Sequence, residues 1–246
     1  MHSISPNLNI MIKACEKASK VIIRDFGEVE NLQVLKKGPK DFVTKTDKRV
    51  EEILIEDLTK SKKNYSFITE ETGIINNSEK DIFWVIDPID GTTNFLHGIP
   101  HFAISIALKI KDEIRSGVIY DPIKNEMFYA EKNIGSFFNN QRIRVSKKSD
   151  LDECLFATNH LGAKFSELNL RYTGCAALDL AYVGAGRLDG FFHNDINIWD
   201  IAAGAIIVEE AGGKINDLNN YEMNNINIRA ASSNIYPKML EKLENF

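Results

Sequence analysis

The stretch from Trp84 to Phe95, W-V-I-D-P-I-D-G-T-T-N-F, constrains the fold of this chain more than any other segment. The apolar β-formers at 82–86 are typical of a strand that is buried on both faces. Asp87-Pro88 is expected to end that strand, because proline has no N–H and holds its neighbour extended. Asp90-Gly91 is a turn signal. The sequence therefore predicts two carboxylates at the tip of a buried strand.

Thr92-Thr93 is expected to start a helix whose unpaired N–H groups face the same point as these carboxylates. Two acids so close together repel each other unless a cation lies between them, whereas the start of a helix favours an anion. A cation site beside an anion site suggests metal-assisted phosphate chemistry. The alternative is that D-P and D-G are only turn signals, which is their usual role.

Composition limits the class of protein. The 246 residues are 43% hydrophobic and 26% charged, which suits a globular domain or two closely packed halves. Cys15, Cys154 and Cys175 are far apart and odd in number, so we expect no disulfide framework and a reducing cytoplasm. We expect neither a signal peptide nor a membrane span. The net charge of -5 argues against binding to a nucleic-acid backbone.

Periodicity predicts the elements of the first half. An apolar stripe over 8–26 predicts a long helix ending at Gly27. The basic segment 36–40 is either a solvated loop or a flap that brings Lys36 to a phosphate. A second helix should follow, with Thr46 or Asp47 as its N-cap. A strand at 67–68, a polar loop at 76–81 and a meander of antiparallel strands at 102–109, 117–120 and 126–131 complete this half.

The second half should contain strands near 155–158, 188–192 and 229–231. Helices are expected from Gly174 to Gly186, from Trp199 to a stop at 212–213, and over 236–243.

Several motifs together resemble one known family. They are D-F-V-T-K-T-D at 41–47, T-E-E at 69–71, D-P-I-D-G-T-T-N-F at 87–95 and W-D-I-A-A-G at 199–204. This set resembles the inositol monophosphatase family, and K-G-P-K-D-F-V-T at 37–44 with G-C-A-A-L-D-L-A-Y-V at 174–183 points to its bacterial inositol-1-monophosphatase branch. The similarity covers nearly the whole chain.

The resemblance implies an α+β fold, a layered α-β-α-β-α sandwich of the inositol monophosphatase and fructose-1,6-bisphosphatase type. A large, mostly antiparallel sheet would come from the first half and a smaller mixed sheet from the second, with the site between them. Residues 1–246 would form a single catalytic unit, with a metal and phosphate half at 1–145 and a substrate half at 146–246.

The resemblance also implies a set of metal ligands. Glu70, Asp87 and the backbone carbonyl of Ile89 would hold a first Mg²⁺. Asp87, Asp90 and Asp200 would hold a second, with Asp87 bridging, and a third, looser ion near Glu70 would bring the total to two or three. Carboxylate and carbonyl oxygens are the ligands that Mg²⁺ prefers.

Catalytic roles follow from the same resemblance. Glu70 and Thr92 would orient the attacking water, and Asp47, paired with the Thr92 hydroxyl, would accept a proton. The amides of Gly91 and Thr92 would cradle the phosphate, while Asp90 would lie beside the substrate as well as the metal.

On the substrate side, Gly174, Cys175 and Ala176 occupy the helix start whose amides would meet substrate hydroxyls. Family members often carry a glutamate seven residues before the aspartate of the tryptophan-aspartate pair, and here that position is His193. A histidine can accept one hydrogen bond and donate another, so it would change which hydroxyls are recognised. His193 could equally be a structural or surface residue.

The segment from Asn159 to Leu170 is shorter than in typical members. We expect an open or hairpin-like link there, because a parallel crossover usually needs a dozen or more residues. One rim of the pocket would then be barer than usual. The family commonly dimerises near this region, so a homodimer is expected but the short segment leaves the oligomeric state open.

The resulting prediction is a cytoplasmic, Mg²⁺-dependent phosphomonoesterase acting on inositol monophosphate or a similar small polyol phosphate, inhibited by Li⁺ and Ca²⁺. Neither nucleic acid nor membrane would be required. One alternative is a related phosphatase for a sugar phosphate, histidinol phosphate or a 3'-phosphonucleotide. Another is a binding or scaffold protein, on RNA or a protein machine, with secondary hydrolase activity.

Overall fold

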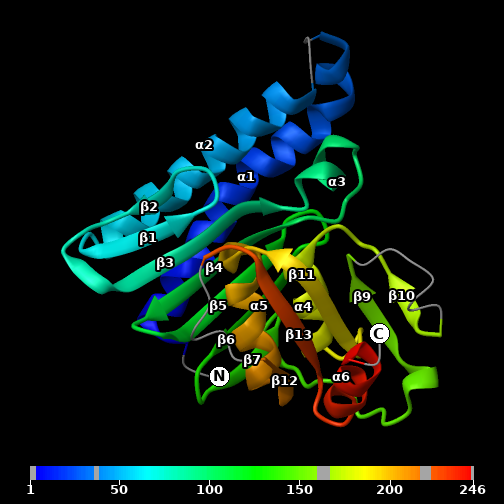
Figure 1. The fold of residues 1–246 in the computed structure, drawn as a ribbon. Helices are drawn as coiled ribbons and strands as arrows, with labels where there is room; N and C mark the ends of the chain where they lie inside the picture. Colours follow the sequence, from blue (N-terminus) through cyan, green and yellow to red (C-terminus); the bar gives the residue numbers. More distant parts are fainter. Residues whose placement is uncertain (1–3, 36–38, 160–166, 217–222, 245–246) are drawn as a thin grey trace.

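The computed structural model describes residues 4–35, 39–159, 167–216 and 223–244, and it consists of alternating layers of helices and sheets (Figure 1). The layered α-β-α-β-α sandwich expected from the sequence is confirmed. Within these ranges, no helix has the length and apolar character needed to cross a membrane.

The larger sheet has eight strands in the order β2-β1-β3-β4-β5-β6-β7-β8. All neighbouring strands are antiparallel except β1 and β3, which are parallel. The strands are β1 (Tyr65–Thr69), β2 (Gly73–Ile75), β3 (Glu79–Asp90), β4 (Ala103–Ile110), β5 (Glu113–Asp121), β6 (Glu126–Glu131), β7 (Gly135–Phe138) and β8 (Gln141–Arg142).

The smaller sheet has five strands in the order β10-β9-β11-β13-β12. It is mixed, because β9 is parallel to both β10 and β11, whereas β13 is antiparallel to β11 and β12. The strands are β9 (Leu155–Thr158), β10 (Asn169–Arg171), β11 (Gly190–Ile196), β12 (Gly213–Ile215) and β13 (Ile226–Ser232).

Six α-helices and one short 3₁₀-helix are present in the described residues. They are α1 (Pro6–Leu35), α2 (Pro39–Ser61), α3 (Thr92–Leu96), the 3₁₀-helix η1 (Leu151–Glu153), α4 (Ala176–Gly184), α5 (Ile198–Glu210) and α6 (Tyr236–Glu244).

Alternation along the strands explains the layers. In β3, Trp84 and Ile86 pack into the core shared with α1 and α2, while Val85 between them packs into the core shared with α4 and α5. In β11, Phe191 faces that same middle core and Phe192 faces the core shared with α6. Each sheet is therefore covered on both faces, which fits the continuous apolar runs seen in the sequence.

The two N-terminal helices are longer than predicted. Helix α1 passes through Gly27 and ends at Leu35, so the predicted stop at Gly27 is wrong. Glycine inside a helix costs only about 1 kcal/mol relative to alanine, which a packed helix tolerates. Helix α2 begins at Pro39, as proline is well suited to a first turn, so Thr46 and Asp47 lie inside the helix and the predicted N-cap is wrong.

The central strand also runs further than predicted. Strand β3 begins at Glu79, within the segment predicted as a loop, and continues through Pro88 to Asp90. The ladder with β4 is irregular there: Asp87 pairs with Ser105 and Asp90 with Ala103, so three residues are spaced against two. Proline is accepted in a sheet at such a bulge. The strand thus does not end at Asp87; the bulge offsets Asp87 from Asp90.

The predicted hairpin-like link after β9 is wrong, because β9 and β10 are parallel neighbours. Residues 159–168 connect them, and 160–166 lie outside the described residues. A crossover this short is possible because β9 and β10 have only four and three residues, so the chain returns over a short distance.

Candidate active site

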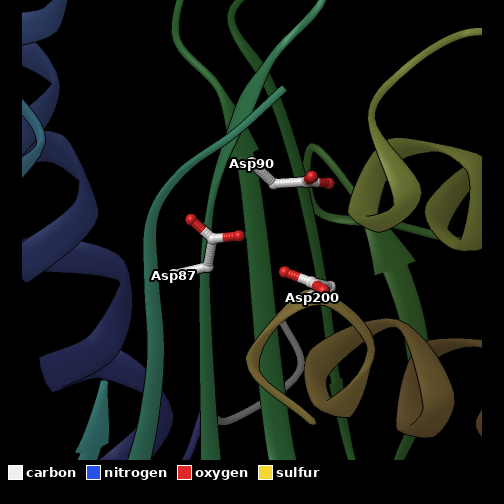
Figure 2. A group of neighbouring side chains, drawn as sticks. All are labelled: Asp87, Asp90 and Asp200. Carbon is white, nitrogen blue, oxygen red and sulfur yellow. The ribbon is translucent and has the colours of Figure 1, made fainter. Parts of the chain in front are cut away.

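Three carboxylates converge between the two sheets. Asp87 and Asp90 come from the bulge of β3, and Asp200 comes from the first turn of α5 (Figure 2). One ligand atom from each of them lies within 4.8 Å of the others. Residues more than 100 positions apart in the chain therefore form one acidic cluster, as the family resemblance implied.

Local hydrogen bonds fix the orientation of Asp200. Asn197 is the N-cap of α5, and its backbone N–H donates to Asp200 Oδ2 at 3.0 Å. The Ser105 hydroxyl of β4 donates to the carbonyl of Trp199 at 3.3 Å. The first turn of α5 is thus tied to the strand that pairs with β3.

Asp87 is 1% exposed, and its Oδ1 accepts the Ile89 N–H at 2.9 Å. Burial raises the pKa of Asp87 well above its usual range, and the neighbouring carboxylates Glu70, Asp90 and Asp200 raise it further. Glu70 lies beside the cluster, close enough for its carboxyl to interact with that of Asp87. Burial of the Glu70 carboxyl raises its pKa to about 7, with further contributions from Asp200.

Asp90 connects the cluster to the second half of the chain. Its Oδ2 accepts the Ala177 N–H at 2.5 Å and the Cys175 thiol at 3.1 Å. Burial and the charge of Asp200 raise the pKa of Asp90 to about 7, although the Ala177 amide works against this shift.

The cluster fits a hard divalent cation. Burial and mutual repulsion both disfavour the ionised carboxylates, and a bound cation removes these two costs together. All the side-chain donors are oxygens, which are the ligands that Mg²⁺ accepts.

The turn after Asp90 carries the predicted phosphate site. Gly91 has φ of 92° and precedes α3, as predicted. A Cβ at this position would lie 3.0 Å from the carbonyl oxygen of His101 and 3.2 Å from the Cβ atoms of Cys175 and Phe102. Both the backbone conformation and the close packing therefore require glycine.

The predicted pair between Asp47 and Thr92 is not formed in this structure. The Thr92 hydroxyl donates instead to the carbonyl of Ile89 at 2.9 Å, within the same turn. Asp47 Oδ1 is buried and has no hydrogen-bond partner among the described residues. Burial raises the pKa of Asp47 to about 8, and the carboxylates Glu71 and Glu70 add to the shift. The catalytic role of Asp47 stays a prediction.

A cavity of about 430 Å³ opens beside the cluster, with Asp90 and Asp200 in its wall. Its size is in the range of small-molecule sites. Besides Asp90, four residues predicted for substrate binding line it: Gly174, Cys175, Ala176 and His193. The remaining lining residues were not predicted, namely Thr158, Asn159, Tyr172, Asp179, Phe191, Asp195 and Ile196. Lys36 lies outside the described residues.

A bulge in β11 shapes one wall of the cavity. The pairing with β13 shifts between His193 and Ile196, and Asp195 adopts a left-handed φ of 56°. The Arg229 guanidinium supports this bulge by donating to the His193 carbonyl at 3.0 Å and to Asn194 Oδ1 at 2.7 Å. The N-D pair at 194–195 was a sequence signal for such a turn, because both residues tolerate left-handed backbone.

Asp179 forms a buried acidic part of the wall. It is 3% exposed, and both of its carboxylate oxygens lie 2.8 Å from the Thr173 hydroxyl. Burial raises the pKa of Asp179 well above its usual range. No local sequence signal marks Asp179 as a site residue, because its neighbours in α4 are apolar.

Asn94 joins the phosphate side of the site to the substrate side. Its side-chain amide donates to the His101 carbonyl and to the Thr173 carbonyl, each at 2.8 Å. Gly174 follows Thr173 in the chain and has a φ of 77°. A Cβ built at Gly174 would lie 3.3 Å from the side-chain nitrogen of Asn94. The turn of α3 and the approach to α4 are thus held together directly.

Comparisons with known proteins agree with this geometry. The inositol-1-monophosphatase of Caulobacter vibrioides is 42% identical, and the match covers 95% of this chain and 99% of that protein. The Nus factor SuhB of Escherichia coli K12 is 41% identical, covering 97% and 96%. The crystal structure of the extragenic suppressor protein SuhB from Bartonella henselae superimposes with a TM-score of 0.88 at 42% identity, covering 98% of this chain and 99% of that one.

Another solved structure, the IMPase of Thermotoga maritima, has a TM-score of 0.84 and is 35% identical over 98% of both chains. The inositol monophosphatase family itself matches residues 4–245. With the acidic cluster, the adjoining cavity and the layered fold in agreement, the chain belongs to the inositol monophosphatase family.

Proposed function

We propose that this protein is a Mg²⁺-dependent phosphomonoesterase that hydrolyses inositol monophosphate or a similar small polyol phosphate. The observation that carries the proposal is the shared wall: Asp90 and Asp200 belong both to the three-carboxylate cluster and to the 430 Å³ cavity. A phosphate ester in this cavity would have its phosphate beside the cation site and its polyol toward His193.

The ligands would be those expected from the family. Glu70, Asp87 and the Ile89 carbonyl would hold one Mg²⁺, and Asp87, Asp90 and Asp200 a second, within a total of two to three. Bound Mg²⁺ would neutralise charge on the phosphate and lower the pKa of an attacking water. The hydrogen bond between Thr92 and the Ile89 carbonyl supports the proposal, because it fixes the position of that carbonyl.

The remaining catalytic groups belong to the turn after β3. The amides of Gly91 and Thr92 would bind phosphate oxygens at the start of α3. Glu70 and Thr92 would orient the water. Pairing of Thr92 with Asp47 would require its hydroxyl to turn away from Ile89.

The character of the cavity supports a polyol as the leaving group. Asp179, Asp195 and His193 offer hydrogen-bond acceptors at the wall, and hydroxyl groups are donors. The described lining residues include no lysine or arginine that could pair with a second phosphate. This composition favours a polyol monophosphate over a 3'-phosphonucleotide.

The test is phosphate release from a substrate panel with and without Mg²⁺, comparing inositol monophosphate with a sugar phosphate, histidinol phosphate and a 3'-phosphonucleotide. We expect Mg²⁺-dependent release that is fastest with the polyol phosphate. Preference for the nucleotide would contradict the proposed substrate class. Background rates with every substrate, in wild type and in Asp90→Asn alike, would favour a binding or scaffold protein.

Some relatives of similar identity are named Nus factor SuhB, so a binding role is the second candidate. The intact acidic cluster favours the enzyme, since a scaffold does not need repelling carboxylates to be buried together. We further propose that 1–145 and 146–246 act as one catalytic unit, because the cluster draws residues from both. A cytoplasmic homodimer that requires neither membrane nor nucleic acid completes the proposal.

A further inference from the structure

The Glu51 side chain lies close to the turn that carries Glu70. Glu51 belongs to α2 and is 2% exposed. Its Oε2 accepts the backbone N–H of Glu71 at 3.0 Å, and its Oε1 accepts the Thr72 hydroxyl at 2.5 Å. These two residues directly follow Glu70 in the turn between β1 and β2.

Hydrogen bonds on both sides of Glu70 define its position. On the N-terminal side, the Glu70 N–H donates to the Ile86 carbonyl of β3 at 3.3 Å. On the C-terminal side, Glu51 holds the next two residues. The peptide of Glu70 is therefore held between the sheet and α2, and its carboxyl reaches Asp87.

The charge of Glu51 also acts on the site. Its carboxylate lies beside the turn that follows Glu70, since its two oxygens accept hydrogen bonds from Glu71 and Thr72. A buried carboxylate beside other acids is unfavourable unless hydrogen bonds and a cation compensate it. The two hydrogen bonds from the turn supply part of that compensation, and a cation held by Glu70 would supply more.

We propose that Glu51 is a positioning residue for the cation site: it anchors the Glu70–Thr72 turn to α2 and adds negative charge behind Glu70. The inference rests on the proposed function, since Glu70 is taken there as a metal ligand. Glu51 itself is not a ligand, because its carboxylate oxygens are directed to the turn.

The test compares Glu51→Ala, Glu51→Gln and the control Glu52→Gln, which changes an exposed glutamate on the same helix. Mg²⁺ binding is measured by titration calorimetry and by tryptophan fluorescence, since Trp199 adjoins Asp200. Residues that orient metal ligands typically contribute 10-fold or more, so we expect Glu51→Ala to weaken Mg²⁺ binding about 10-fold. Glu51→Gln keeps one acceptor and should weaken it about 3-fold, and Glu52→Gln should match wild type.

A lowered melting temperature in Glu51→Ala with unchanged Mg²⁺ affinity would mean a purely structural role and would overturn the inference. Should Glu51→Ala fail to fold, Thr72→Val removes one hydrogen bond to Glu51 at an exposed position and is expected to weaken Mg²⁺ binding about 2-fold. Wild-type affinity in Thr72→Val and Glu51→Gln together would also overturn it. Absence of Mg²⁺ binding in the wild type would instead refute the proposed function itself.

Discussion

The carboxylate of Asp90 accepts the backbone N–H of Ala177 at 2.5 Å, so an acid of the first sheet satisfies a free amide at the start of α4. One oxygen of Asp90 is thereby directed to α4, and the other remains available to a cation. The same side chain positions the substrate-side helix and contributes to the acidic cluster. Formation of the cation site and docking of α4 therefore depend on each other.

Asp90→Asn should separate these two roles. The asparagine oxygen can still accept from Ala177, so the fold should survive, while the loss of charge should lower Mg²⁺ affinity and hydrolysis by at least about 100-fold. Calorimetric Mg²⁺ titration, kinetics and circular dichroism provide the readouts. Asp112→Asn, at an exposed turn between β4 and β5, is the matched control and should behave as wild type. Full activity in Asp90→Asn would rule out a ligand role.

Stability without metal should depend on pH in a defined direction. The pKa values of Glu70 and Asp90 are raised to about 7 in the folded state, so folding favours their protonated forms. The stability gained from these protonated carboxyls is fully present below their pKa values in the unfolded chain, which are about 4. It is lost as the pH rises to the folded-state pKa of about 7. Melting temperatures in EDTA should therefore fall between about pH 4 and pH 7, and saturating Mg²⁺ at neutral pH should restore them.

Asp90→Asn provides the control for this pH effect, because it removes one of the titrating groups and should flatten the slope. A melting temperature that rises in EDTA over the same range, and does so equally in Asp90→Asn, would contradict the assignment.

Gly91→Ala should be strongly disruptive. The left-handed backbone and the 3.0 Å contact with the His101 carbonyl together should cost on the order of 1–3 kcal/mol of stability and displace the amides that we propose bind phosphate. Gly98→Ala is a matched comparison, because Gly98 also has positive φ, of 68°, but a Cβ there would meet no atom within 4 Å. We expect Gly98→Ala to lose stability but keep catalysis, as measured by denaturation and kcat/KM. Similar kinetic losses in both variants would argue against a specific role for the Gly91 turn.

Asp195→Gly should change substrate affinity without destabilising the fold. Glycine adopts the left-handed backbone of this position freely, so the free energy of unfolding should stay within about 1 kcal/mol of wild type. Loss of the carboxylate from the cavity wall should raise KM for a polyol phosphate about 3- to 10-fold. Lys111→Gly is the control: Lys111 has a similar left-handed φ of 55° but lies at an exposed turn. This variant should leave KM unchanged. A wild-type KM in Asp195→Gly would exclude contact with the substrate.

Competing cations should inhibit the enzyme. Li⁺ at tens of millimolar and Ca²⁺ should lower phosphate release at fixed Mg²⁺, because oxygen clusters of this kind are sensitive to ion size and geometry. Raising Mg²⁺ should shift the inhibition curve if the ions share the cluster. Activity unaffected by either ion would contradict this prediction, though not metal-dependent hydrolysis in general.

The parts predicted correctly from the sequence are those with strong local signals. The apolar run before Asp87 and the turn at 90–91 predicted the positions of Asp87 and Asp90. Both a buried strand and a turn can be recognised from a few adjacent residues. The end of α1 was missed because Gly27 is compatible with a helix as well as with its stop. The parallel pairing of β9 with β10 could not be predicted from local sequence either, because strand pairing is a tertiary contact.

Some site residues had no distinct local signal. Asp179 is placed in the cavity wall by the packing of α4, and Glu51 reaches the β1–β2 turn from a helix distant in sequence. Such roles arise only from tertiary contacts. By contrast, Asp200 was identified because W-D-I-A-A-G at 199–204 matches a motif of the family that the chain resembles.

The carboxamide of Asn94 connects the two sides of the site. Because it donates to the His101 carbonyl on its own side and to the Thr173 carbonyl on the other, parting the two sides of the site would break the hydrogen bond to Thr173. The walls of the cavity are thus held together without a ligand. If the proposed ester binds in this cavity, little of its binding free energy is then spent on ordering the chain.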